Sequence, residues 1–143
     1  MTGFLVAILS GVLMALQGVF NTGVTKQASL WTTAAFANLT GLIVCLCVWL
    51  YKDRTSFLKL MEVKPLYLLL GGTIGVFITC TVIVSMGKIG PAKATMFIVI
   101  AQLLTAYVIE LFGWFQTEKQ PFDLSKIIGM VIAIIGVIIF KWK

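Results

Sequence analysis

The stretch QASLWTTAAFANLTGLIVCLCVWLY, residues 27–51, contains no charged residue and lies between Lys26 and Lys52. An α-helix needs about 20 consecutive apolar residues to cross the hydrocarbon core of a bilayer. This stretch is long enough to do so, and lysines at both ends are typical of the boundaries of a spanning helix. It therefore predicts a transmembrane helix.

The composition of the whole chain agrees with this prediction. Hydrophobic residues make up 60% of the 143 residues and charged residues 11%, and the mean hydropathy is +1.07. A soluble domain is about half apolar and a quarter charged. The composition therefore indicates an integral membrane protein.

Further apolar stretches on both sides of residues 27–51 predict an all-α fold with five membrane-spanning helices in one domain over residues 1–143. We expect the helices at residues 3–21, 31–51, 65–86, 92–114 and 124–141. Pro65 and Pro91 suit first-turn positions, and Asp123 suits an N-cap. The first segment lacks a basic leader and a small-residue cleavage site, so we expect it to be retained.

Small residues recur at spacings of four along four of these predicted helices. They are Ala7, Gly11, Ala15, Gly71 and Gly75, and also Thr33, Ala37, Gly41, Gly129 and Ala133. Small side chains let helix backbones approach closely in a membrane. These positions predict helix packing, either within one bundle or between chains.

Basic residues divide almost evenly between the two sides of a five-helix chain. One side carries Lys52, Arg54, Lys59, Lys64, Lys119 and Lys126, and the other carries Lys26, Lys88, Lys93, Lys141 and Lys143. Six against five gives almost no orienting bias. We therefore hypothesise insertion in both orientations and an antiparallel homodimer; the alternative is one orientation set by unequal weighting of the loops.

The same scattered distribution argues against nucleic-acid binding, because single basic residues at helix ends contact lipid headgroups instead.

Motifs of enzymes are missing as well: there is no histidine, no GxxxxGK[ST] loop and no nucleophile elbow. We therefore expect no enzymatic activity, no cofactor and no metal site. Cys45, Cys47 and Cys80 lie in apolar segments and are interpreted as packing residues. Without an ATP site, transport would need an ion or substrate gradient.

Polar side chains inside the predicted helices are few. Gln17 and Asn21 lie on one stripe of the first helix together with Ser10 and Met14, and Gln102 lies in the fourth helix. Amides of this kind can bind a ligand or form hydrogen bonds between helices, each of which contributes about 1 kcal/mol. The sequence leaves both interpretations open.

Glu110 is the acidic residue that interrupts the apolar run AQLLTAYVIELFGW, residues 101–114. A carboxylate inside a spanning helix costs roughly 3 kcal/mol, so it should face the bundle interior or water. Leu103, Ala106 and Tyr107 share its face, and Tyr107 offers a hydroxyl group to the carboxylate or a ring to a cation. Glu110 is therefore predicted as a site where a proton and a cationic substrate compete. The alternative is that it reaches the headgroups from the end of the helix.

Four segments in this order resemble the YdcZ-like family, five-helix members of the drug/metabolite transporter superfamily. They are SGVLMALQGVFNTGV at residues 10–24, LLLGGTIGVFIT at 68–79, GKIGPAKATMFIVIAQLLTAYVIELFGWF at 87–115 and IIGMVIAIIGVIIF at 127–140. Gln17, Asn21, Gln102, Glu110 and Gly113 fall on positions that recur in the family's motifs. The family often has an Asp-His pair where this chain has Glu110 and Leu111, so a second titrating group is missing here.

The resemblance implies a bacterial inner-membrane transporter with a bundle like that of the drug/metabolite transporters. We expect a proton-coupled secondary transporter subunit that moves a small organic cation or metabolite, with a site lined by Gln17, Asn21, Gln102, Tyr107 and Glu110. Two alternatives remain open. A small dual-topology channel would pass current without saturation, and an accessory or scaffold protein would tolerate Glu110→Gln.

Overall fold

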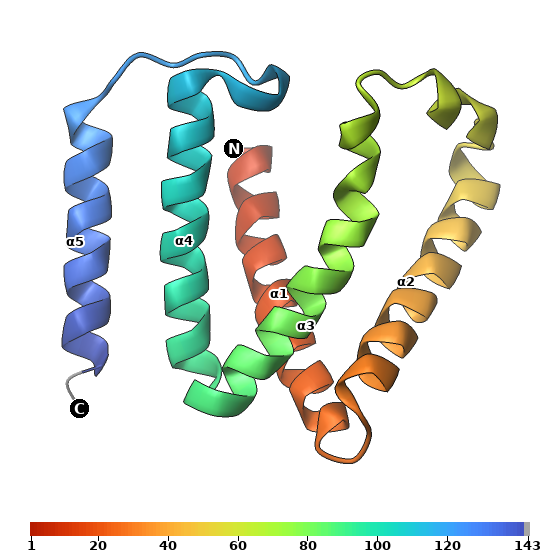
Figure 1. Cartoon of the computed structure of the whole chain (residues 1–143), viewed down its shortest axis with the longest axis horizontal. Coiled ribbons are helices and arrows are strands. Elements are labelled where there is room, and N and C mark those ends of the chain that lie inside the picture. Colours follow the sequence, from red (N-terminus) through yellow and green to blue (C-terminus); the bar gives the residue numbers. More distant parts are fainter. Residues whose placement is uncertain (142–143) are drawn as a thin grey trace. The chain divides into compact units, whose positions relative to one another are not determined.

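The computed structural model describes residues 1–141; Trp142 and Lys143, the latter counted above among the basic residues, lie outside this range. The described chain consists of helices and loops, with no strand (Figure 1). In order the elements are α1 (Thr2–Thr25), α2 (Leu30–Lys52), η1 (Phe57–Glu62), η2 (Leu66–Leu70), α3 (Gly71–Ile89), α4 (Pro91–Phe112), η3 (Trp114–Gln116) and α5 (Leu124–Lys141). The predicted all-α class is confirmed.

Four helical segments are long and apolar enough to cross a membrane. They are Thr2–Thr25, Leu30–Lys52, Leu66–Ile89 and Pro91–Phe112. The fifth helix, α5, is also apolar but shorter, with 18 residues, or about 27 Å at roughly 1.5 Å per residue. Its length lies at the lower end of the range that spans hydrocarbon.

The chain forms two compact units, Met1–Lys88 and Ile89–Lys143, and each is described by itself. In the first unit α1 contacts α2, and Gly18 of α1 lies against Met86 and Val82 of α3. The connection from α1 to α2 is held by the Ser29 hydroxyl, which caps α2 by accepting a hydrogen bond from the Thr32 N–H at 3.1 Å. The Thr25 hydroxyl donates to that of Thr33 at 3.0 Å, which joins the adjoining ends of the two helices.

Gly18 of α1 lies against α3. A Cβ atom at Gly18 would lie 2.6 Å from Met86 Sδ and 3.0 Å from Val82 Cγ1. Both Gly18 and Met86 are buried. The two helices therefore pack backbone to side chain here, and a larger residue at this position would require the Met86 and Val82 side chains to shift.

The predicted packing glycines have no such neighbour within the chain. A Cβ atom at Gly11, Gly71 or Gly75 would meet nothing within 4 Å in the described structure. Ala7 is exposed and Ala15 is half-buried. Packing at these five positions stays a prediction. The open space at the three glycines is compatible with packing against a second chain.

Three of the predicted helices have boundaries that differ from those of the structure. Residues 66–70 form the 3₁₀ helix η2, so the α-helix expected from residue 65 begins at Gly71 and runs on to Ile89. The fourth helix ends at Phe112 rather than at residue 114, because Gly113 adopts a left-handed conformation with φ of 66°. The first helix continues past residue 21 to Thr25, and the hydroxyl groups of Thr22 and Thr25 donate to carbonyls one turn back.

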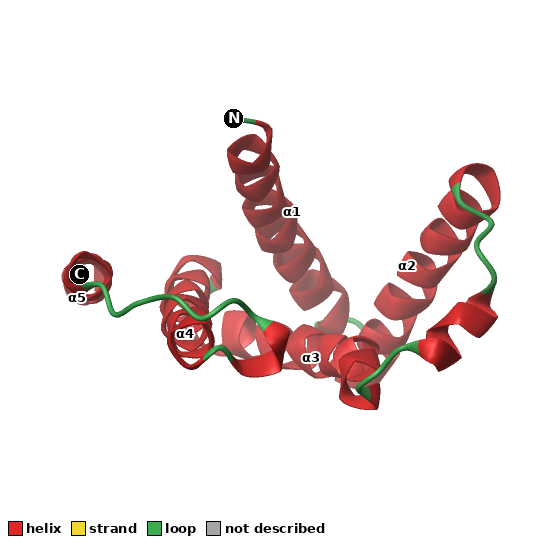
Figure 2. Cartoon of the chain, turned by 90° about the horizontal axis from the view of Figure 1, so that it is seen from above, coloured by secondary structure: helices red, strands yellow, loops and turns green. Residues whose placement is uncertain are grey.

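The second unit consists of α4, η3 and α5, and α4 and α5 lie side by side with antiparallel chain directions (Figures 1 and 2). Pro91 occupies the start of α4, as predicted. Asp123 precedes α5, and its Oδ1 accepts a hydrogen bond from the Ser125 N–H at 2.8 Å, which is the predicted N-cap. The chain between the helices folds back, so that the Gln120 N–H donates to the Glu110 carbonyl at 2.9 Å.

Candidate functional site

The end of α4 and the start of α5 are held together by Tyr107. Its hydroxyl group accepts a hydrogen bond from the Asp123 N–H at 3.2 Å and lies 3.4 Å from the Asp123 carbonyl oxygen, to which it donates. The residue that caps α5 is thereby fixed against the side of α4. This contact determines which side chains of the first turn of α5 face Glu110.

Lys126 is the side chain of that first turn that reaches Glu110. Its Nζ lies 3.2 Å from Glu110 Oε2, and both side chains are partly exposed, at 44% for Lys126 and 42% for Glu110. The same Nζ lies 5.7 Å from the centroid of the Tyr107 ring, within the range of a cation–π interaction. The ammonium group of Lys126 therefore contacts both a carboxylate and an aromatic ring.

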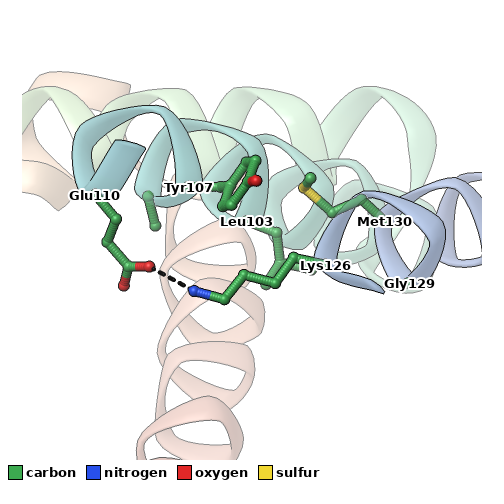
Figure 3. A pocket seen from close by; sticks show the side chains of 7 residues that line it. Leu103, Tyr107, Glu110, Lys126, Gly129 and Met130 are labelled. Carbon is green, nitrogen blue, oxygen red and sulfur yellow. Dashed lines mark hydrogen bonds and ion pairs between the residues drawn. The ribbon is translucent and has the colours of Figure 1, made fainter. Parts of the chain in front are cut away.

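The ion pair lines a pocket of about 370 Å³ between α4 and α5 (Figure 3). Its other lining residues are Leu103, Ala106, Tyr107, Gly129 and Met130. The volume lies at the lower end of the range for small-molecule sites, which are mostly apolar with a few polar groups. The pocket thus combines one charged and aromatic corner with an apolar wall.

Glu110 lies in the last turn of α4, two residues before Phe112. The predicted neighbours Leu103, Ala106 and Tyr107 do share its face, since all of them line the same pocket. Lys126 was missed as a site residue because a lysine at the end of an apolar segment is typical of a headgroup anchor. The available signal was that the fourth and fifth helices follow each other in the chain, so that the end of one and the start of the next lie on the same side of the membrane.

The two amide side chains of α1 lie in the first unit, where α1 contacts α3. Gln17 and Asn21 line a cavity of about 40 Å³ together with Met14, Gly18 and four residues of α3, namely Ile78, Thr79, Val82 and Ile83. This volume is far below the roughly 300–1,000 Å³ that is usual for small-molecule sites. The predicted stripe of Met14, Gln17 and Asn21 therefore faces α3.

Gln102 lies on α4 but lines neither of these cavities. Within the described residues, no hydrogen bond joins the side-chain amide of Gln17, Asn21 or Gln102 to another group. The five predicted site residues thus lie in three separate places. Tyr107 and Glu110 line one cavity, Gln17 and Asn21 line another, and Gln102 lines neither. Their joint role in one site stays a prediction.

Comparison with known proteins places the chain in a family. The family model described as "Putative inner membrane exporter, YdcZ" matches residues 2–139. No curated protein and no solved structure matches the chain.

Proposed function

Because this chain belongs to the YdcZ family of inner-membrane exporters, we propose that it exchanges a small organic cation for protons at Glu110. The family and the apolar helices make the chain an integral inner-membrane protein with a transport role. The cation, the proton coupling and the assembly described below are the proposal. The pocket that contains Glu110 and Tyr107 is the observation that carries it.

The chemistry of the pocket favours a cation. Glu110 supplies a negative charge, and the face of the Tyr107 ring attracts an ammonium group through its quadrupole. The pocket also lies at the C-terminal end of α4, where the partial negative charge of the helix dipole adds to that of the carboxylate. Leu103, Ala106 and Met130 offer apolar surface to the rest of the substrate.

The proposed proton coupling rests on the single carboxylate of the pocket. Glu110 can hold a proton or face an ammonium group, and the two alternatives exclude each other. We propose that the site changes the side of the membrane it faces only when a proton or a cation neutralises Glu110. The proton and the cation would then move in opposite directions. The proposed cycle therefore needs Glu110 and no second titrating group.

The proposed active form is an antiparallel homodimer within membrane lipid. Gln17 and Gln102 are exposed side chains inside spanning helices, and their amides have no hydrogen-bond partner among the described residues. Unsatisfied amide groups are costly in hydrocarbon, so a second chain, water or a ligand must satisfy them. A dimer would supply such partners, and the even division of basic residues lets the two copies insert in opposite orientations.

The experiment that tests this proposal measures proton movement into or out of liposomes that contain the purified protein, with a pH-sensitive dye inside, because exchange of one proton for one monovalent cation moves no net charge. Organic cations such as hexyltrimethylammonium and a set of neutral metabolites are presented to the wild type, Glu110→Gln and the control Lys119→Met. We expect saturable proton movement with at least one cation, none in Glu110→Gln and the wild-type rate in Lys119→Met. An electrical current that does not saturate would favour a channel. Absence of proton movement for every compound, or an unchanged Glu110→Gln variant, would favour an accessory role.

A further inference from the structure

The proposed cation site already holds an ammonium group, that of Lys126. Lys126 Nζ lies 3.2 Å from Glu110 Oε2 and 5.7 Å from the Tyr107 ring centroid. These are the two groups that would recognise the ammonium group of a substrate. Figure 3 shows the lysine side chain extending from α5 along the pocket to the carboxylate.

We propose that Lys126 is a tethered competitor for the substrate site, which makes it a determinant of substrate affinity. When no substrate is bound, the ammonium group of Lys126 occupies the position beside Glu110 and Tyr107. The ammonium group of the substrate occupies the same position when the substrate binds. This inference rests on the proposed function and adds the third occupant of Glu110, besides the proton and the substrate.

The partial exposure of the pair fits a contact that is made and broken. Both side chains are more than two-fifths exposed, and exposed ion pairs are weak because solvent screens them and holding two long side chains costs entropy. Lys126 is also joined to Glu110 by this one contact, while Tyr107, rather than Lys126, holds the two helices together through Asp123. Release of Lys126 therefore leaves the pocket walls in place.

Displacement of a lysine defines the class of substrate. The side chain of lysine is a butylammonium group, so a ligand must offer an ammonium group and additional apolar contact to replace it. Leu103, Ala106 and Met130 supply that contact, and Gly129 leaves space, since a Cβ atom there would meet nothing within 4 Å. The site is therefore assigned to alkylammonium compounds with an apolar body longer than that of lysine.

The test is the dissociation constant Kd of hexylammonium for the purified full chain, measured by calorimetry, with 1-hexanol as the uncharged control. Lys126→Met removes the charge and keeps an unbranched apolar side chain. An intramolecular competitor raises the apparent Kd by the inverse of the fraction of time that the site is free. We expect Lys126→Met to bind hexylammonium about three- to tenfold more tightly, with no change for 1-hexanol.

Three further variants separate competition from other effects of the charge. Lys119→Met loses the same charge outside the pocket and should keep the wild-type Kd. Lys126→Arg keeps a competing cation and should also stay within about twofold. The double variant Glu110→Gln/Lys126→Met should bind no better than Glu110→Gln, because the competitor acts only through the carboxylate.

An unchanged or weaker Kd in Lys126→Met would overturn the inference, and so would equal tightening in Lys119→Met or a gain that persists in the double variant. Thermal unfolding identifies a variant that has lost its fold; if Lys126→Met has done so, Lys126→Gln removes the same charge and serves as the test, with the same tightening expected. Failure of the proposed function looks different. In that case Glu110→Gln transports like the wild type, whatever the Kd values of the Lys126 variants.

Discussion

Tyr107 contributes two separate groups to the pocket between α4 and α5. Its hydroxyl group binds the backbone of Asp123, where α5 begins, and its ring faces the ammonium group of Lys126. The first contact is structural and the second belongs to the proposed cation site. Substitutions can remove them one at a time.

Tyr107→Phe should lower stability and leave cation binding nearly unchanged. It removes the hydroxyl group that accepts from the Asp123 N–H at 3.2 Å, and a hydrogen bond of this kind contributes about 1 kcal/mol. The ring is retained, so the Kd of hexylammonium should stay within about twofold. Thermal unfolding and calorimetry of the purified variant measure the two effects.

Tyr107→Leu is the matched variant, since it removes the ring as well. Loss of a cation–π contact costs about 0.5–2 kcal/mol, so hexylammonium should bind roughly two- to thirtyfold more weakly. Equal Kd values for the Phe and Leu variants would show that the ring takes no part in cation binding.

The residues of the pocket also show which parts of the site could be predicted from the sequence. The spacing of Leu103, Ala106, Tyr107 and Glu110 predicted one helix face, and the pocket confirms it. Periodicity within one helix could not identify Lys126, because its position depends on how two helices pair. The role of Glu110 in transport is still a prediction.

At the level of elements, the contact between α1 and α3 depends on Gly18. Small residues at Gly11 and Gly18 look alike in the sequence, and only the path of the neighbouring helix separates them. Gly18 lies against Met86 and Val82, whereas Gly11 faces open space within the chain. This is why the sequence predicted small-residue packing on α1 without identifying Gly18.

Gly18→Leu should destabilise the first unit, while Gly11→Leu should not. A side chain at Gly18 must displace the buried Met86 and the β-branched Val82, and overpacking of this kind costs about 1–3 kcal/mol or more. At Gly11 a leucine meets nothing and improves helix propensity by a few tenths to about 1 kcal/mol. Thermal unfolding of the purified variants in detergent compares them. Equal loss of stability in both would contradict the packing described here.

At the level of the whole molecule, the number of spanning helices and the charge of the loops decide orientation. Long apolar stretches predicted the four spans found within the described residues, and the fifth predicted helix, α5, is shorter. Composition could not predict the division into two units, because that depends on which helices contact each other. Orientation in the membrane follows from the basic residues.

Replacing both Lys59 and Lys64 by Gln should shift the orientation of the chain. The near balance of six against five basic residues becomes four against five, so more copies should place the other side in the cytoplasm. A reporter fused to the C-terminus, read on each side of the membrane, measures the ratio. Lys26→Gln with Lys88→Gln is the matched pair and should shift the ratio in the opposite direction.

Wild-type chains should give reporter activity on both sides of the membrane. Activity on one side only, unchanged by either pair of substitutions, would contradict insertion in both orientations.

The most direct test of the central claim, exchange of a proton for a cation at Glu110, is accumulation driven by a pH gradient. Liposomes containing the purified protein are made acidic inside, and uptake of hexyltrimethylammonium is measured, since this permanent cation cannot cross as a free base. The account predicts accumulation above the outside concentration in the wild type and in Lys119→Met, and none in Glu110→Gln. Equal accumulation in Glu110→Gln, or wild-type uptake that stops at the outside concentration, would contradict it.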